Sequence, residues 1–199
     1  MSQIIETLMH EHRVIEEVLG ALGSLAGDDA LERETVADFA RFFRDFADHC
    51  HHGKEEKQLF VALVDAGVPR EQGPIAVMLA EHEQGRAHVR ALAALGAGYG
   101  PLSAEERKLF TVHASEFVFL LRNHISKENG VLYPMAEARL SPSTLVDLAA
   151  RCEAFERDVV GAGKHEQLHA LADKLVAAYP PQEGPDIAPP CQHLNRVCC

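Results

Sequence analysis

Two stretches of the chain place a histidine four residues before a glutamate. In "HCHHGKEEKQLF" the pair is His51 and Glu55, and in "NHISKENGVLYP" it is His124 and Glu128. Residues four apart on a helix share one face, and here that face is otherwise apolar. A carboxylate buried on such a face is costly unless a cation compensates its charge. Imidazole and carboxylate together are common metal ligands, so the spacing predicts metal binding inside a helical core.

Two further histidines complete a repeated pattern. His12 ends "LMHEH" and His82 ends "MLAEH", and each lies on the apolar stripe of its own helix. The two lone histidines are 70 residues apart, and the two histidine–glutamate pairs are 73 residues apart. Two helical hairpins that each give one histidine and one such pair predict a dinuclear site, with two histidines per metal and both carboxylates able to bridge. The predicted ligands are His12, His51, Glu55, His82, His124 and Glu128.

The second helix contains a competing pair one residue out of phase, His52 with Glu56. The apolar pair that follows each motif favours Glu55, because Leu59 then takes the place that Leu132 takes after Glu128. Helical phase accordingly assigns His51 to the core and leaves His49 and His52 on neighbouring faces. The lone His113 is expected to be a hydrogen-bonded core residue rather than a ligand.

The elements that must position these residues are helices. Apolar residues recur every three and four positions in four long segments, at about 2–25, 28–65, 75–92 and 104–138. Ser103 with Glu106 predicts a capping box, and Ser141 before Pro142 predicts another helix start. We therefore predict an all-α fold, an up-down-up-down four-helix bundle over 1–138, with a short helical extension over 139–179 and a flexible tail over 180–199.

Composition excludes several classes of protein. The formal net charge of −11, from 30 acidic and 19 basic residues, argues against a nucleic-acid groove. No apolar run reaches the roughly 18 residues of a membrane span, and the N-terminus becomes charged too early for a signal peptide, so a cytoplasmic location is expected. The five cysteines are expected to be thiols. Cys50 is interpreted as a buried filler, and Cys191, Cys198 and Cys199 either as incidental or as a thiol switch.

Other metal chemistries fit less well. Ferritin-like bundles use Glu-x-x-His pairs, and the only one here is Glu166 with His169 in the short C-terminal helix. "HEQLH", from His165 to His169, also matches the zinc-hydrolase pattern, but a third ligand would be needed farther along the chain, where Glu183 in the proline-rich tail is a weak candidate. A role for His165 or His169 over one end of the bundle is an alternative. Mixed ligation favours iron, with manganese or zinc as substitutes.

The motifs "EHR", "HHGKEEKQLF", "EHEQGR" and "HISKENGVLYP" resemble those of the hemerythrin-like, His-His-Glu cation-binding family. The resemblance covers about residues 2–138. It implies an oxo- or hydroxo-bridged non-haem di-iron centre held by the six ligands named above. Oxygen carriers of the family place a histidine where this chain has Arg86 and an aspartate where it has Asn129.

These departures favour a protein that binds or reduces dioxygen, nitric oxide or peroxide, as a sensor or in stress protection, over reversible oxygen storage. Its partners would be that small ligand and an unidentified electron donor. We expect weak oxidant reduction rather than classical enzyme activity, and a monomer or weak homo-oligomer. The alternatives are an iron-delivery protein without turnover and, third, a metal-dependent hydrolase.

Overall fold

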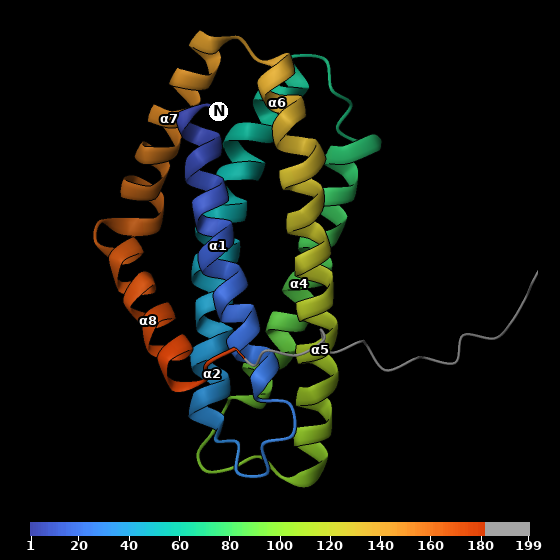
Figure 1. Cartoon of the computed structure of the whole chain (residues 1–199), viewed down its shortest axis with the longest axis vertical. Helices are drawn as coiled ribbons and strands as arrows, with labels where there is room; N and C mark the ends of the chain where they lie inside the picture. The colour runs from blue at the N-terminus through green and yellow to red at the C-terminus, as the bar shows by residue number, and fades with distance from the viewer. Residues whose placement is uncertain (182–199) are drawn as a thin grey trace, which may run out of the picture.

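A computed structural model describes residues 1–181 of the chain, and these residues are almost entirely helical (Figure 1). The described residues form no β-strand, and their one isolated bridge joins Glu32 to Pro101. The first half contains α1 (Gln3–Ser24), α2 (Arg33–Phe42), the π-helical segments η1 (Phe43–His52) and η2 (Glu55–Leu59), α3 (Phe60–Asp65) and α4 (Gly73–Leu95). The second half contains α5 (Ala104–Lys127), the π-helical η3 (Glu128–Leu132), α6 (Tyr133–Arg139), α7 (Pro142–Phe155), the π-helical η4 (Glu156–Gly161) and α8 (Lys164–Ala178). The all-α prediction is confirmed.

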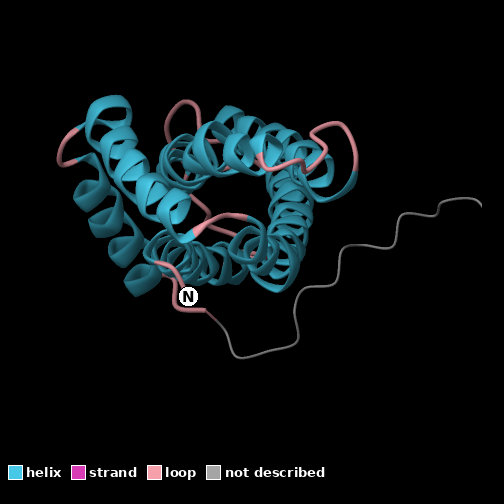
Figure 2. Cartoon of the chain, turned by 90° about the horizontal axis from the view of Figure 1, so that it is seen from above, coloured by secondary structure: helices cyan, strands magenta, loops and turns pink. Residues whose placement is uncertain are grey.

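Four long helical runs surround a common interior. They are α1, the run from α2 to α3, α4, and the run from α5 to α6, and Figure 2 shows them as a ring seen end-on. α4 packs against α5 and α2, and α1 packs against α5 and η1. Side chains that point inward from all four runs can therefore meet.

The last helices lie outside this ring, on the side of α1 (Figures 1 and 2). α7 packs against α1 and η2, and α8 packs against α1, α2 and η1. Both predicted helix starts are confirmed: the Ser103 hydroxyl and the Glu106 side chain form a capping box, and the Ser141 side chain accepts a hydrogen bond from the Thr144 backbone. No helix among residues 1–181 is long and apolar enough to cross a membrane.

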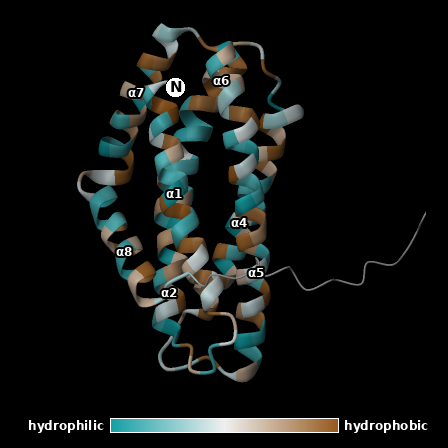
Figure 3. Cartoon of the chain, in the orientation of Figure 1, coloured by the Kyte–Doolittle hydropathy of each residue, from teal (hydrophilic) through white to brown (hydrophobic). Residues whose placement is uncertain are grey.

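The apolar core is divided into two clusters. One contains Leu19, Phe39 and Phe117, and the other contains Leu8, Phe60 and Leu132. Hydrophilic and hydrophobic residues alternate along each helix in Figure 3, as expected for helices with one buried face. Ten polar or charged residues are also buried, eight of them histidine or glutamate from the predicted motifs or adjacent to them: Glu11, His12, His51, His52, Glu55, His82, His124 and Glu128. Charged and polar side chains buried in this way are costly unless hydrogen bonds or opposite charges compensate them.

Candidate metal centre

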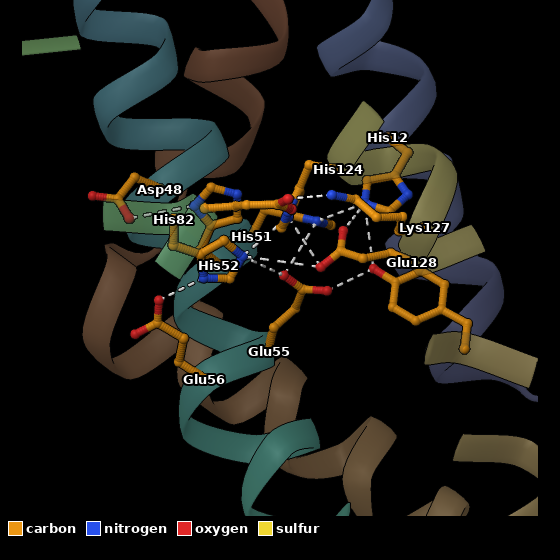
Figure 4. Close-up of polar contacts among 12 residues, drawn as sticks. His12, Asp48, His51, His52, Glu55, Glu56, His82, His124, Lys127 and Glu128 are labelled. Carbon is orange, nitrogen blue, oxygen red and sulfur yellow. Dashed lines mark hydrogen bonds and ion pairs between the residues drawn. The ribbon is translucent and has the colours of Figure 1, made fainter. Parts of the chain in front are cut away.

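The six predicted ligands come together in the interior of the ring. α1 carries His12, α4 carries His82, and the two longer runs carry one histidine–glutamate pair each (Figure 4). Every one of the six side chains has an exposed fraction of 2% or less. Helical spacing therefore identified side chains that the fold does bring together, from segments up to 116 residues apart.

The side chains form two adjacent groups of potential ligand atoms. His12, His51, Glu55 and Glu128 make the first group, and His52, Glu55, His82 and His124 make the second. Within each group the atoms lie within 4.8 Å of one another. Glu55 belongs to both groups, as expected for a bridging carboxylate.

His52 corrects the sequence interpretation, which left it on a neighbouring face. Its side chain is 5% exposed, and its ring stacks on that of His82 with centroids 3.8 Å apart. Its Nδ1 lies 3.5 Å from a carboxylate oxygen of Asp48. The expected two histidines for each metal thus become two in the first group and three in the second.

The physical reason is the π-helical geometry of η1. Hydrogen bonds from i to i+5 put an additional residue into each turn, so the inward face drifts relative to an α-helix. Consecutive histidines can then both face the interior. The segments η2 and η3 begin at Glu55 and Glu128 themselves, so the helices are widened at both carboxylates.

The outward nitrogens of four histidines are held by hydrogen bonds. Nδ1 of His51 donates to Glu11 over 2.8 Å, and Nδ1 of His124 donates to Glu81 over 3.0 Å. Because a carboxylate only accepts, Nδ1 of each ring must carry a proton, and in the neutral imidazole Nε2 then keeps its lone pair. Orienting contacts of this kind are typical of metal-ligating histidines.

The other two histidines follow the same arrangement. Nδ1 of His82 donates to Glu56 over 2.7 Å, and Nδ1 of His12 donates to the amide oxygen of Asn129 over 2.8 Å. Glu56 and Asn129 are separated by the 73 residues that separate His51 from His124. This contact decides between the two neighbouring glutamates: Glu56 orients His82, and Glu55 lies in the centre.

Each orienting carboxylate is paired with a cation. Lys54 contacts Glu11, and Lys127 contacts Glu81. Both lysines immediately precede an inner glutamate in the chain. Arg86 contacts Glu56 over 2.7 Å and so balances the charge of this carboxylate. At this position the oxygen carriers of the family that the sequence resembles have histidine. These outer charges compensate one another and leave the two inner carboxylates to be compensated by something else.

The two halves of the centre differ at matched positions. Tyr133 is the counterpart of Phe60, and its hydroxyl donates to Glu55 over 2.8 Å and lies 3.3 Å from Nε2 of His12. His52 is the counterpart of Ile125. The first group consequently has fewer imidazoles and a hydroxyl beside it, whereas the second has an additional imidazole.

The inner atoms fit a pair of metal ions. Nε2 of His12 faces Nε2 of His51 at 2.9 Å, and Nε2 of His82 faces Nε2 of His124 at 3.1 Å. In neutral rings with the proton on Nδ1, these are facing lone pairs, which repel unless a cation lies between them. Glu55 Oε2 and both oxygens of Glu128 are buried and accept no hydrogen bond from the described residues, while Nε2 of His12 and Nε2 of His124 each lie 3.1 Å from one Glu128 oxygen. Cations would satisfy all of these atoms together.

Burial and neighbouring charges shift the protonation of the inner groups in different directions. It lowers the pKa of His51 to about 4, against the opposing hydrogen bond to Glu11, so this imidazole is neutral at pH 7. Burial and the nearby Glu128 raise the pKa of Glu55 well above its usual value. Burial acts to raise the pKa of Glu128 as well, but His124 and His12 hold it well below that value. Burial and the charge of Glu55 keep Tyr133 protonated by raising its pKa, so its hydroxyl is a donor.

The remaining sequence candidates lie outside the centre. His165 and His169 face each other through Nε2 atoms 2.8 Å apart and pack on Phe46, while Glu166 is exposed. Cys50 is buried as predicted, and burial raises its pKa to about 12. Glu183 and the cysteines of the tail, Cys191, Cys198 and Cys199, lie outside the described residues. His113 is only partly buried, so it is not the core residue that was expected, although its Nδ1 lies at hydrogen-bond distance, 3.3 Å, from Nδ1 of His88.

Comparison with known proteins agrees with this geometry. The family model described as the hemerythrin HHE cation binding domain matches residues 3–136. The matched part contains every ligand candidate of both groups and all of their orienting partners. No curated protein and no solved structure matches the chain.

Proposed function

Because the chain belongs to the hemerythrin HHE cation-binding family, we propose that this metal-binding protein holds two non-haem iron ions and binds or reduces a small oxidant. The oxidant would be dioxygen, nitric oxide or peroxide, and an external donor would supply electrons for turnover. The biological role would be sensing or protection against such oxidants. We also propose that the four helical runs alternate in direction, up and down, around the centre.

The facing Nε2 atoms and the unpartnered inner carboxylate oxygens carry this proposal. Five imidazoles and two carboxylates are too few to fill two six-coordinate shells, so positions are left for an exogenous ligand. Iron suits this mixture of nitrogen and oxygen donors, and manganese or zinc could substitute. When bound, the iron pair would supply redox electrons and the coordination positions at which the oxidant is held.

The difference between the two groups supports a position for the proposed oxidant. The first group has two histidines, His12 and His51, and the second has three. We therefore place the exchangeable position on the side of the first group. Tyr133 lies on that side, and its protonated hydroxyl, which here donates to Glu55, would have to turn from that carboxylate to donate a hydrogen bond to an oxygen or nitrogen atom of the bound molecule.

Iron content tests the metal assignment. Protein purified from its own host should contain about two iron ions per chain, and its oxidised form should show the near-ultraviolet absorption of a bridged ferric pair. Glu55→Ala and Glu128→Ala should each lower the iron content sharply, while Glu17→Ala, at an exposed position of α1, should not. One zinc ion per chain, at a content unchanged in Glu55→Ala and Glu128→Ala, would contradict the proposal.

Reactivity distinguishes an oxidant-handling protein from an iron-delivery protein. Reduced protein mixed rapidly with peroxide or nitric oxide should be oxidised at a rate that saturates with ligand, and added reductant should return it to its initial spectrum. An iron-delivery protein would instead lose iron to a chelating acceptor without such cycling. Complete burial of the ligand side chains argues against easy release.

A further inference from the structure

A second cluster of metal-ligating side chains lies on the outer surface of the α4–α5 pair. His88 comes from α4, and His113 and Glu116 come from α5, one helical turn apart. All three are half-exposed, and one ligand atom from each lies within 4.8 Å of the others. None of them belongs to the buried centre or orients one of its ligands.

The spacing of the ligand atoms suits a tetrahedral ion. Nδ1 of His88 and Nδ1 of His113 are 3.3 Å apart, and a Glu116 oxygen lies 3.9 Å from Nδ1 of His88. Two nitrogens bound to zinc at about 2.0–2.1 Å with a tetrahedral angle are separated by about 3.3–3.4 Å. The histidines therefore already have the separation that binding requires, and only the carboxylate has to move.

The surroundings leave the site open on one side and supported on the other. A cleft of about 640 Å³ adjoins it, and its polar lining includes Glu81, Gln84, His88, Glu116 and Asn123. Water in this cleft could complete the coordination shell. Phe117 packs beside His88, with ring centroids 6.4 Å apart, which limits the orientations of the imidazole. Burial also lowers the pKa of His88, which favours its neutral, metal-binding form.

Two rival clusters near α8 are weaker candidates. The pair His165 and His169 presents only two facing nitrogens. The group formed by Glu11, Cys50, Glu156 and His165 offers four ligand atoms, but the ammonium of Lys54 already contacts both of its carboxylates. A metal ion there would have to displace a buried lysine.

We propose that His88, His113 and Glu116 form an accessory binding site for a divalent transition metal ion of the zinc class, accessible from solvent and separate from the buried centre. The proposal goes beyond the oxidant-binding function and does not depend on it. Affinity should be moderate, because three protein ligands leave the remaining positions to water.

Cobalt(II) is a suitable probe because tetrahedral cobalt absorbs in the visible region. Full-length protein with its central metal in place is titrated with cobalt(II), and central metal content is measured before and after. One additional ion per chain should bind. His88→Ala and His113→Ala should weaken this binding about tenfold or more, and Glu116→Gln should weaken it as well, all with central metal content and thermal unfolding unchanged.

His49→Ala, at an exposed histidine elsewhere, and His169→Ala, in the rival pair, should bind cobalt as the unaltered protein does. The proposal is overturned if no additional ion binds, if binding survives in His88→Ala and His113→Ala, or if it is lost in His169→Ala. Iron content is measured independently, so failure here is distinguishable from failure of the central assignment.

Discussion

Glu11 immediately precedes His12 in the chain, yet its carboxylate accepts the hydrogen bond of His51, 40 residues away, over 2.8 Å. Glu81 precedes His82 and does the same for His124. Each Glu-His pair thus supplies one ligand candidate and orients the ligand candidate of a neighbouring helical run. These contacts join the two helical runs of each hairpin, whereas the hydrogen bonds of His82 with Glu56 and of His12 with Asn129 join one hairpin to the other.

Removal of these orienting carboxylates should weaken metal binding without removing a ligand. Glu11→Gln and Glu81→Gln keep the side-chain size but lose the charge that fixes the ring proton on Nδ1. We expect metal affinity to fall about 10- to 100-fold in each variant. Competition with a chelator of known affinity measures this change. Glu17→Gln on the exposed face of α1 is the matched control, and unchanged affinity in both variants would argue that the outer carboxylates only support the fold.

His52→Ala should affect the two ions unequally. The second group would fall from three histidines to two, while the first would keep His12 and His51. We expect roughly half of the bound metal to be lost or to become exchangeable, as measured by elemental analysis after dialysis. His49→Ala, at the exposed histidine of the same segment, should retain all of it. If His52→Ala keeps all of its bound metal, His52 is not a metal ligand.

Tyr133→Phe removes a buried hydrogen bond to Glu55 while leaving both ligand groups intact. The loss of this donor should lower the free energy of unfolding by about 1–3 kcal/mol, because Glu55 loses a partner in the interior. Bound metal should be retained, but oxidation of the reduced protein by peroxide should change in rate. Urea unfolding and stopped-flow absorbance measure the two effects. Tyr179→Phe, distant from the centre, is the control for rate, and an identical rate in Tyr133→Phe would exclude the hydroxyl from oxidant binding.

Glu106 should make stability depend on pH in the acid range. Its hydrogen bonds with Arg33 and Ser103 lower its pKa to about 2, below its ordinary value of 4.5. A depressed carboxylate pKa contributes stability that is present above pH 4.5 and is lost as pH falls toward 2. The difference in unfolding free energy between the unaltered protein and Glu106→Gln should therefore shrink from pH 6 to pH 3. The neighbouring exposed residue gives the control, Glu105→Gln, for which urea titrations should show a much smaller pH-dependent difference.

Local periodicity was sufficient to predict much of this protein. The stripe Leu8, His12, Ile15, Leu19 and Leu22 is buried throughout, because the faces of a helix are set by residue spacing alone. The capping residues Ser103 and Ser141 were predictable for the same reason, since a cap depends on the few residues that follow it. The six inward histidines and glutamates were found because a polar residue on an apolar stripe stands out without any knowledge of its neighbours.

The residues that sequence reasoning missed depend on backbone geometry or on other helices. His52 faces the interior because η1 is π-helical, and a pattern analysis that assumes 3.6 residues per turn assigns it elsewhere. One signal could have found it: three histidines within four residues make the inward face ambiguous. The accessory cluster was equally hidden, since His88 and His113 meet only across the α4–α5 contact.

The sequence by itself determined that the chain is helical, which face of each helix is buried, and that histidine and glutamate occur on those faces in a repeated order. Those properties follow from the spacing of neighbouring residues. Only the tertiary structure decided how the ligand candidates divide into groups of two and three histidines, which carboxylate orients which ring, and where Tyr133 is placed. These depend on the rotation and packing of helices around one another, and that arrangement is set by the sum of many side-chain contacts between distant segments.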